Sequence, residues 1–361
     1  MKLLFALSGF HSHDRGAEVA LMSVAEAMAM TGDDVVLMGS GFPRAGTSYH
    51  FQHVNSVPRE RFENWPHFPP LRSETAWEDA SFSFNLLRAY DPREFDAVIT
   101  CAFPFTHWAL RRPTRRKPLQ IFVTQNGDWP AFANRSEYRT FSCDGLVCTN
   151  PDYFERNQAR WNCALIPNGV DLSRFKPGKG DRSRFGFPTD KKIILMVSAF
   201  IDSKRVLEGI RAVAQMADAY LVVAGDGPLR AEAQALADTL MPGRFQRVSL
   251  AAGEMPALYQ SADVFLHLSL LESFGNVFLE AWASGLPIVA HDTDRLRWIL
   301  GKHGHLCDTE DQSVLKQAIA NALTSSTTCN TNGIERFAWS KIAEEYRDFI
   351  RKLNREASPV R

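Results

Sequence analysis

The feature that most constrains this chain is an alternation of short apolar runs with longer amphipathic segments, which occurs twice. In the first half, strands are predicted at residues 3–7, 34–38, 97–100, 121–124 and 145–148, and a helix at 18–30. After Pro167, strands are predicted at 193–197, 220–224, 264–268 and 287–290, and helices at 206–216, 229–240 and 277–284. Apolar runs of this kind are typical of parallel strands buried on both faces. The sequence therefore predicts an α/β fold with two Rossmann-like, doubly wound parallel-sheet domains.

The length of 361 residues also favours two domains, because it exceeds what one ordinary core needs. We place the domains at residues 1–167 and 168–340. A linker-like Pro177-Gly178-Lys179-Gly180 lies close to this boundary, and residues 340–353 are predicted to form a final amphipathic helix. Residues 41–77 are rich in proline, aromatic and charged residues and lack a period, so we expect an irregular segment with one short strand.

Bulk composition excludes several classes of function. The formal net charge is zero, which argues against a protein that binds nucleic acid through a positively charged surface as a whole. No window approaches 18 apolar residues, and the polar stretch after the first apolar run argues against a signal peptide. The six cysteines are scattered without a CxxC pair, which favours reduced thiols. We therefore expect a soluble cytoplasmic protein.

The most informative segment runs from Leu271 to Pro287 and reads LESFGNVFLEAWASGLP. Two carboxylates, Glu272 and Glu280, lie eight residues apart on either side of a predicted helix start. At about 1.5 Å of rise per residue they are on the order of 10 Å apart, too far for an acid–base dyad but suited to the two ends of an elongated ligand. The amides of Gly275, Asn276 and Val277 at the helix start favour an anion such as a phosphate. A sugar nucleotide fits this pattern.

This segment resembles the E-x7-E motif of the family 4 retaining glycosyltransferases, whose context is ESFG…EAxAxGxPV. Two further segments support the resemblance: Ile166-Pro167-Asn168-Gly169-Val170-Asp171, and Gly225-Asp226-Gly227-Pro228-Leu229. The resemblance covers nearly the whole chain. It implies the GT-B fold, in which two Rossmann-like domains face each other across a cleft and the C-terminal segment, here 341–361, packs back on the first domain.

The resemblance also implies roles for individual residues. Glu272 is expected to hold the transferred sugar, Glu280 the ribose, and Lys204 the pyrophosphate of the donor. Ser273, Phe274, Gly275, Asn276 and Val277 are expected to form the phosphate-binding loop. Lys204 and Glu272, with Asn126 near the transferred sugar, are the predicted catalytic residues.

Two positions depart from the family pattern. Ala199 stands where an arginine usually precedes the lysine by five residues, and Arg205 is the predicted replacement for that cation. In the first half, Gly16 belongs to a loop that resembles the family's Gly-Gly-x-Glu loop, with Arg15 where glycine is common. Many relatives have a histidine where this chain has Gln125 and Asn126. The candidate alternatives for that histidine are His11, His13, His107, His267 and His291.

The resemblance implies a retaining, metal-independent hexosyltransferase that uses a UDP-sugar or GDP-mannose and needs no cofactor. We assign Asp292-Thr293-Asp294 to a solvated loop rather than a metal site. The acceptor is expected to be a glycan, a lipid-linked saccharide or a small metabolite, recognised by residues 41–77 and nearby loops. A basic cluster is a candidate contact with a membrane surface or an anionic acceptor: Arg111, Arg112, Arg115, Arg116 and Lys117.

Two other functions stay open. Because of Ala199, the chain could be a catalytically weak subunit that binds a sugar nucleotide and supports a partner. A nucleotide-sugar epimerase on the same fold is the third hypothesis. A nicotinamide-dependent oxidoreductase is disfavoured, because no G-x-G-x-x-G follows the first predicted strand.

Overall fold

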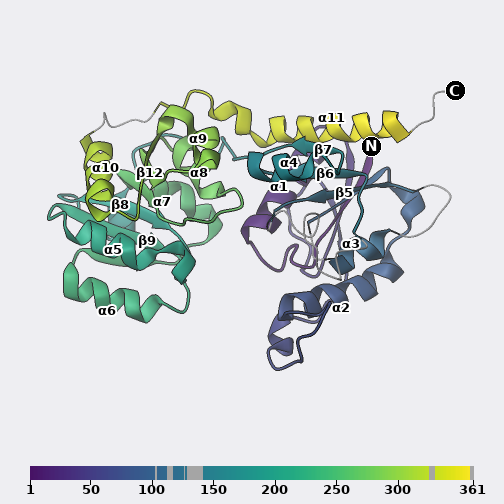
Figure 1. Ribbon diagram of the computed structural model, residues 1–361, viewed down its shortest axis with the longest axis horizontal. Helices are drawn as coiled ribbons and strands as arrows, with labels where there is room; N and C mark the ends of the chain where they lie inside the picture. The colour runs from purple at the N-terminus through teal and green to yellow at the C-terminus, as the bar shows by residue number, and fades with distance from the viewer. Residues whose placement is uncertain (102–103, 112–116, 126, 128–140, 325–329, 358–361) are drawn as a thin grey trace. The chain divides into compact units, whose positions relative to one another are not determined.

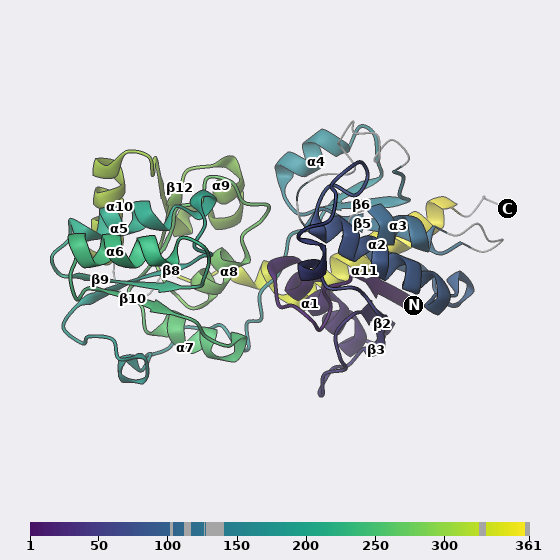
Figure 2. The same ribbon diagram turned by 90° about the horizontal axis from the view of Figure 1, so that it is seen from below.

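A computed structural model describes residues 1–101, 104–111, 117–125, 127, 141–324 and 330–357 of the chain. These residues form two compact units (Figures 1 and 2). The N-terminal unit consists of Met1–Gly169 together with the C-terminal segment that starts at Trp339. The second unit consists of Val170–Ala338.

The N-terminal unit is built on a parallel sheet, with seven strands in its described residues, in the order β3-β2-β1-β4-β5-β6-β7. Its strands are β1 (Lys2–Ala6), β2 (Asp34–Gly39), β3 (His50–His53), β4 (Ala97–Thr100), β5 (Leu119–Val123), β6 (Gly145–Cys148) and β7 (Cys163–Leu165). In the register, Phe5 of β1 lies between Leu37 of β2 and Ile99 of β4. The chain order reverses direction between β1 and β4, which makes this pair the topological switch point of the sheet.

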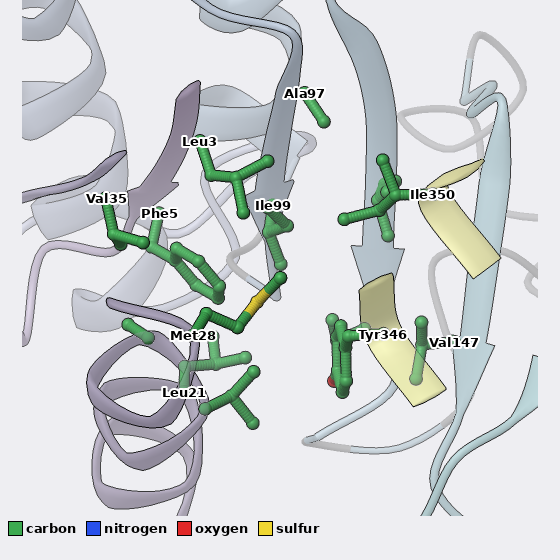
Figure 3. Packing of buried hydrophobic residues seen from close by; sticks show 14 of the residues in the cluster. Leu3, Phe5, Leu21, Met28, Val35, Ala97, Ile99, Val147, Tyr346 and Ile350 are labelled. Atoms are coloured by element: carbon green, nitrogen blue, oxygen red, sulfur yellow. The ribbon is translucent and has the colours of Figure 1, made fainter. Parts of the chain in front are cut away.

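Helices cover both faces of this sheet. They are α1 (Gly16–Met30), α2 (Glu74–Ala89), α3 (Pro104–Leu110), α4 (Pro151–Asn157) and α11 (Trp339–Ala357). Two short 3-10 helices, η1 (Arg59–Phe62) and η2 (Pro92–Glu94), also belong to the described part of this unit. One face packs against α1 and α11, and Leu21 and Met28 of α1 share a hydrophobic cluster with Tyr346 and Ile350 of α11 and with the strand residues (Figure 3). The other face packs against α2, whose Phe82 and Leu86 contact the sheet. An ion pair between Arg347 and Asp33, at 2.9 Å, ties α11 to the turn after α1.

The second unit contains a parallel sheet, described with six strands, in the order β10-β9-β8-β11-β12-β13. Its strands are β8 (Lys192–Val197), β9 (Ala219–Ala224), β10 (Phe245–Val248), β11 (Val264–His267), β12 (Ile288–His291) and β13 (Gly304–Cys307). Its helices are α5 (Val206–Ala214), α6 (Arg230–Leu240), α7 (Met255–Gln260), α8 (Asn276–Ala283), α9 (Asp294–Leu300) and α10 (Gln312–Thr324). Separate hydrophobic clusters lie on the two faces of this sheet, so it too is doubly wound.

The predicted pair of Rossmann-like parallel sheets is confirmed, with some differences in detail. The segment 41–77 contains β3 and η1 and is otherwise irregular up to Ser73, but α2 begins at Glu74, inside the region expected to be irregular. Ser73 starts this helix, because its side chain accepts a hydrogen bond from the Ala76 amide at 3.3 Å. Among the described residues, none of the helices combines the length and apolar character needed to cross a membrane.

Candidate functional site

The predicted site residues of the second unit gather at the switch point of its sheet. The strand order reverses between β8 and β11, and ligands of doubly wound sheets bind beyond the carboxyl ends of the strands at such a reversal. The chain leaving β8 forms a short 3-10 helix, η5 (Asp202–Lys204), that ends at Lys204. The chain leaving β11 carries Glu272 and then enters α8. Two neighbouring strands therefore bring together side chains that are 68 residues apart in the sequence.

A tight turn between β9 and α6 supports the segment that carries Lys204. The Phe200 amide donates a hydrogen bond to the Asp226 carbonyl at 3.0 Å, and the Leu229 amide donates one to the Phe200 carbonyl at 3.0 Å. Gly225 has no room for a side chain, because a Cβ there would lie 2.1 Å from the Ser198 carbonyl oxygen. The Gly-Asp-Gly-Pro turn thus fixes the path of the chain between β8 and η5.

Glu272 is the centre of a compact charged cluster. Its Oε1 atom accepts a hydrogen bond from the Lys204 ammonium group, in a short ion pair. The same atom lies 3.0 Å from Nε2 of His267, the last residue of β11. His267 is almost fully buried, with its ring edge-on to Phe278 at 4.8 Å between centroids. Lys204 and Glu272 remain partly exposed, so a ligand can reach both.

The surroundings of Glu272 keep it ionised. Burial by itself would raise its pKa, but the hydrogen bond to His267 and the charge and hydrogen bond of Lys204 lower the pKa to about 2. Glu272 is therefore a carboxylate at neutral pH, an acceptor suited to sugar hydroxyl groups.

The start of α8 has the backbone geometry expected of an anion-binding turn. Gly275 precedes the helix with φ 89° and ψ 71°, a left-handed conformation that favours glycine. A Cβ at this position would lie 2.6 Å from the Phe278 ring. The Phe274 side chain is buried in the core of the unit, so it can offer a ligand only its backbone. Ser273, Asn276 and Val277 are partly exposed around the same turn.

Glu280 lies one turn further along α8 and is held by a residue of α7. The Tyr259 hydroxyl donates a hydrogen bond to Glu280 Oε2 at 2.8 Å. Burial raises the pKa of Glu280, whereas the hydrogen bond from Tyr259 and the charge of Arg174 oppose that rise. Glu280 thus has a fixed orientation and one oxygen, Oε1, that Tyr259 does not engage in the described contacts.

Arg205 bonds to two neighbouring segments of the second unit. It adopts a left-handed backbone conformation, φ 54° and ψ 41°, between η5 and α5. Its guanidinium group donates hydrogen bonds to the Leu268 carbonyl, to the Thr309 hydroxyl at 3.0 Å and to the Thr309 carbonyl at 3.1 Å. The side chain therefore ties the end of β11 to the segment after β13. A contact between Arg205 and the donor phosphate stays a prediction.

In the N-terminal unit, Gly16 is the first residue of α1, at the switch point of that sheet, and an added Cβ there would meet no atom within 4 Å. Asn126 lies outside the described residues. The neighbouring Gln125 is buried, and its amide is engaged in a reciprocal pair with Asn168, at 2.7 and 3.1 Å. Gln125 therefore fixes the segment that leads into the second unit.

Sequence reasoning missed Tyr259 and the contact of His267 with Glu272. His267 is one of five candidate alternatives for the family's histidine, but its separation of five residues from Glu272 does not predict that the two side chains meet. No sequence pattern indicates Tyr259, because it belongs to a different helix from Glu280 and the two side chains meet only through the packing of these helices.

The described residues offer no obvious metal site. Among them, no three His, Cys, Asp or Glu residues gather in a group that could hold an ion. Asp292 and Asp294 instead surround Arg297, with Asp292 bonded to its guanidinium through two 2.7 Å contacts and Asp294 through one at 3.0 Å. Thr293 caps α9 and Asp294 is the first residue of that helix, so the segment is a helix start rather than the loop that we expected.

The fold and the site define a doubly wound α/β protein whose second sheet presents a cation, two carboxylates and a helix start at its switch point. Residues 15–174 match the family model described as Glycosyltransferase Family 4, and residues 179–340 match the model described as Glycosyl transferases group 1. The chain belongs to this family of glycosyltransferases.

Individual proteins agree with this assignment. The lipopolysaccharide core biosynthesis glycosyltransferase LpsE of Rhizobium meliloti is 30% identical over 55% of this chain and 58% of its own length. A GDP-mannose-dependent phosphatidylinositol dimannoside mannosyltransferase of Mycobacterium tuberculosis is 30% identical over 59% of both chains. This chain thus spans less than two thirds of the length of these relatives. The structure of sucrose-phosphate synthase from Thermosynechococcus elongatus has a TM-score of 0.76 at 20% identity, covering 99% of this chain and 100% of its own, which shows the shared GT-B fold.

Proposed function

We propose that this chain is a retaining, metal-independent glycosyltransferase that moves a hexose from a nucleotide-diphosphate donor to a hydroxyl acceptor. One observation carries the proposal: Lys204 and Glu272 meet at the switch point of the second sheet, beside the glycine turn that starts α8. A cation, a carboxylate and a helix start suit the diphosphate and the sugar of one donor molecule.

Each of these residues has a part in the proposed reaction. Lys204 and the amides of Gly275, Asn276 and Val277 stabilise the negative charge that develops on the departing diphosphate. Glu272 accepts hydrogen bonds from hydroxyl groups of the transferred sugar. Glu280, oriented by Tyr259, accepts hydrogen bonds from the ribose hydroxyls.

The proposed chemistry is a front-face displacement. The bond between C1 of the sugar and the diphosphate oxygen breaks, and the acceptor oxygen forms the new bond to C1 on the same face. The leaving diphosphate takes the proton of the acceptor hydroxyl. The protein contributes by positioning both substrates and by stabilising charge, so no side-chain nucleophile is needed.

For the acceptor, we propose a lipid-linked or glycan hydroxyl. The names of the relatives refer to a lipopolysaccharide core and a phosphatidylinositol dimannoside. In the N-terminal unit, Trp65 and Phe68 are half exposed and pack edge-on against Trp77, at 4.9 and 5.9 Å. Such a surface suits the C–H faces of a saccharide. From the basic cluster, Arg111 and Lys117 are exposed, whereas Arg112, Arg115 and Arg116 lie outside the described residues.

The direct test is a transfer assay in EDTA with radiolabelled UDP-glucose, UDP-galactose, UDP-N-acetylglucosamine and GDP-mannose, each with and without membrane lipid extract as a source of acceptors. We expect one donor to be consumed, by slow hydrolysis alone or by transfer, with retention at C1 by proton NMR. A requirement for added divalent metal, or inversion at C1, would contradict the proposal.

One observation favours the alternative of a catalytically weak sugar-nucleotide-binding subunit. Ala199 supplies no cation, and the guanidinium of Arg205, its expected replacement, is bonded to Leu268 and Thr309. Under this alternative, a nucleotide binds but none of the four donors is consumed. Interconversion of donor sugars without acceptor would indicate an epimerase instead.

A further inference from the structure

The cluster around Glu272 is arranged for an exchange of partners. One carboxylate oxygen, Oε1, accepts from both Lys204 and His267. While Lys204 is bonded to Glu272, the negative charge of that carboxylate offsets the positive charge of the ammonium group. Under the proposed function, the donor diphosphate competes with Glu272 for this ammonium group, and the ion pair opens when the diphosphate takes it. Glu272 then needs another partner, because a partly buried carboxylate without one is costly.

His267 is placed to remain the hydrogen-bond partner of Glu272 when Lys204 moves away. It lies at the end of β11 with 2% of its surface exposed, and Phe265 and Phe278 flank its ring. Its Nδ1 atom is buried and has no hydrogen-bond partner among the described residues. The Glu272 carboxylate can only accept hydrogen bonds, so the Nε2 atom of His267 carries a proton and donates to Glu272. Packing prevents this donor from moving away when Lys204 does.

We propose that the ion pair with Glu272 holds Lys204 in the empty donor site, an arrangement that we call the latch. His267 is then the positioning residue that keeps Glu272 in place when Lys204 turns to the donor diphosphate. This inference rests on the proposed function, because it takes a donor diphosphate to bind beside Lys204. The latch itself involves only Lys204, His267 and Glu272 and can be tested without a donor. Its consequence is that the free nucleoside diphosphate competes with Glu272 for Lys204.

Four variants separate the latch from ordinary structural effects. Glu272→Gln keeps a hydrogen-bond acceptor for His267 but removes the charge that holds Lys204. His267→Leu removes the second donor, so Glu272 depends on Lys204 alone. His267→Gln places an amide nitrogen close to the position of Nε2, whereas His267→Asn places one close to Nδ1, which does not face Glu272.

Binding of UDP and GDP, measured by isothermal titration calorimetry in EDTA, gives the first readout. For the nucleotide that binds, we expect Glu272→Gln to bind it roughly fivefold more tightly than the wild type and His267→Leu roughly fivefold more weakly. His267→Gln should stay within about twofold of the wild type, and His267→Asn should behave like His267→Leu.

The double variant decides whether His267 acts through Glu272. In Glu272→Gln/His267→Leu, we expect the affinity of Glu272→Gln alone, because the latch is already open. If His267→Leu weakens binding equally in both backgrounds, His267 acts only through the general structure and the proposal is overturned. Weaker diphosphate binding by Glu272→Gln would also overturn it.

A second readout does not depend on any nucleotide. The rate at which N-hydroxysuccinimidyl acetate acetylates Lys204, followed by peptide mass spectrometry, reports how often its amine leaves Glu272. We expect faster labelling in Glu272→Gln and slower labelling in His267→Leu, with the exposed Lys192 as internal reference. Equal Lys204 labelling in all variants contradicts the latch. An absence of nucleotide binding with altered labelling contradicts only the proposed function.

Discussion

At the scale of single residues, Gly275 shows how strongly the site depends on one backbone conformation. Its left-handed φ disfavours any side chain by about 1–2 kcal/mol, and a Cβ would also press on the Phe278 ring. We expect Gly275→Ala to lower the free energy of unfolding by about 2–4 kcal/mol and to weaken nucleotide binding. Urea denaturation and calorimetry measure the two effects.

Gly253→Ala is the matched control, because a Cβ there would meet no atom within 4 Å. It should change stability by less than about 1 kcal/mol. If Gly275→Ala were as mild as this control, the turn before α8 would not be constrained in the way described.

The pair of Tyr259 and Glu280 gives a prediction that depends on pH. Burial raises the pKa of Glu280, and the hydrogen bond from Tyr259 opposes that rise. Tyr259→Phe removes the opposing contact, so the pKa rises further and less of the carboxylate is ionised at acid pH. Because the ribose needs an ionised acceptor in our proposal, we expect this variant to lose more nucleotide affinity at pH 5.5 than at pH 8. An equal loss at both pH values would show that Tyr259 does not act through the charge of Glu280.

Sequence alone could indicate Glu272, Glu280 and the turn at Gly275, because chemistry and backbone geometry both require these residue types within one continuous segment. It could not indicate His267 as the partner of Glu272, or Tyr259 as the partner of Glu280. Those contacts depend on how β11 and α7 pack against α8, and packing leaves no local pattern in the residues involved.

At the scale of elements, the packing of α2 on α3 contains a buried acid. Asp79 accepts hydrogen bonds from the Thr106 hydroxyl and from the Thr106 amide, the latter at 3.2 Å. Burial raises its pKa from 3.8 to about 7. The folded state therefore binds this proton more tightly than the unfolded state, and stability decreases as pH rises from about 4 to 7.

Asp79→Asn should remove this pH dependence. Between pH 5 and pH 8, we expect the free energy of unfolding of the wild type to fall by about 2–3 kcal/mol more than that of the variant. Urea denaturation at the two pH values measures the difference. Identical pH dependence in both proteins would mean that Asp79 is ionised in the folded state at pH 5.

The elements that sequence predicted well were those with long apolar runs or clear helical periodicity. β4 and β6 were predicted at their observed bounds, since all their residues are buried. β3, β10 and β13 are edge strands with half-exposed and polar residues, so they carry no apolar run. The helix α2 was not predicted at all, and its first turn follows a segment dense in proline and aromatic residues.

At the scale of the whole molecule, the chain completes its N-terminal unit with its last helix. Ile350 of α11 is fully buried against the sheet, in the same hydrophobic cluster as residues of β1 and α1 that precede it by more than 300 residues (Figure 3). We expect Ile350→Ala to destabilise the N-terminal unit by about 2–5 kcal/mol. Lys352→Ala, at an exposed position of the same helix, should have little effect.

Because Ile350 belongs only to the N-terminal unit, the variant should separate thermal unfolding into two transitions. Calorimetry should show the lower one shifted down, while the second unit unfolds at the wild-type temperature. A single transition that shifts as a whole would show that the two units unfold cooperatively.

The general architecture was predictable because two sets of alternating strands and helices leave few other ways to bury their apolar faces. The central claim, that the switch point of the second sheet binds a nucleoside diphosphate without metal, is tested most directly by calorimetric titration of UDP, GDP and ADP in EDTA. We predict micromolar binding of one diphosphate, weakened at least tenfold by Lys204→Ala and by Glu280→Ala and unchanged by Lys192→Ala at the opposite end of β8. Absence of binding by all three nucleotides, or equal binding by the Lys204 variant, would contradict the claim.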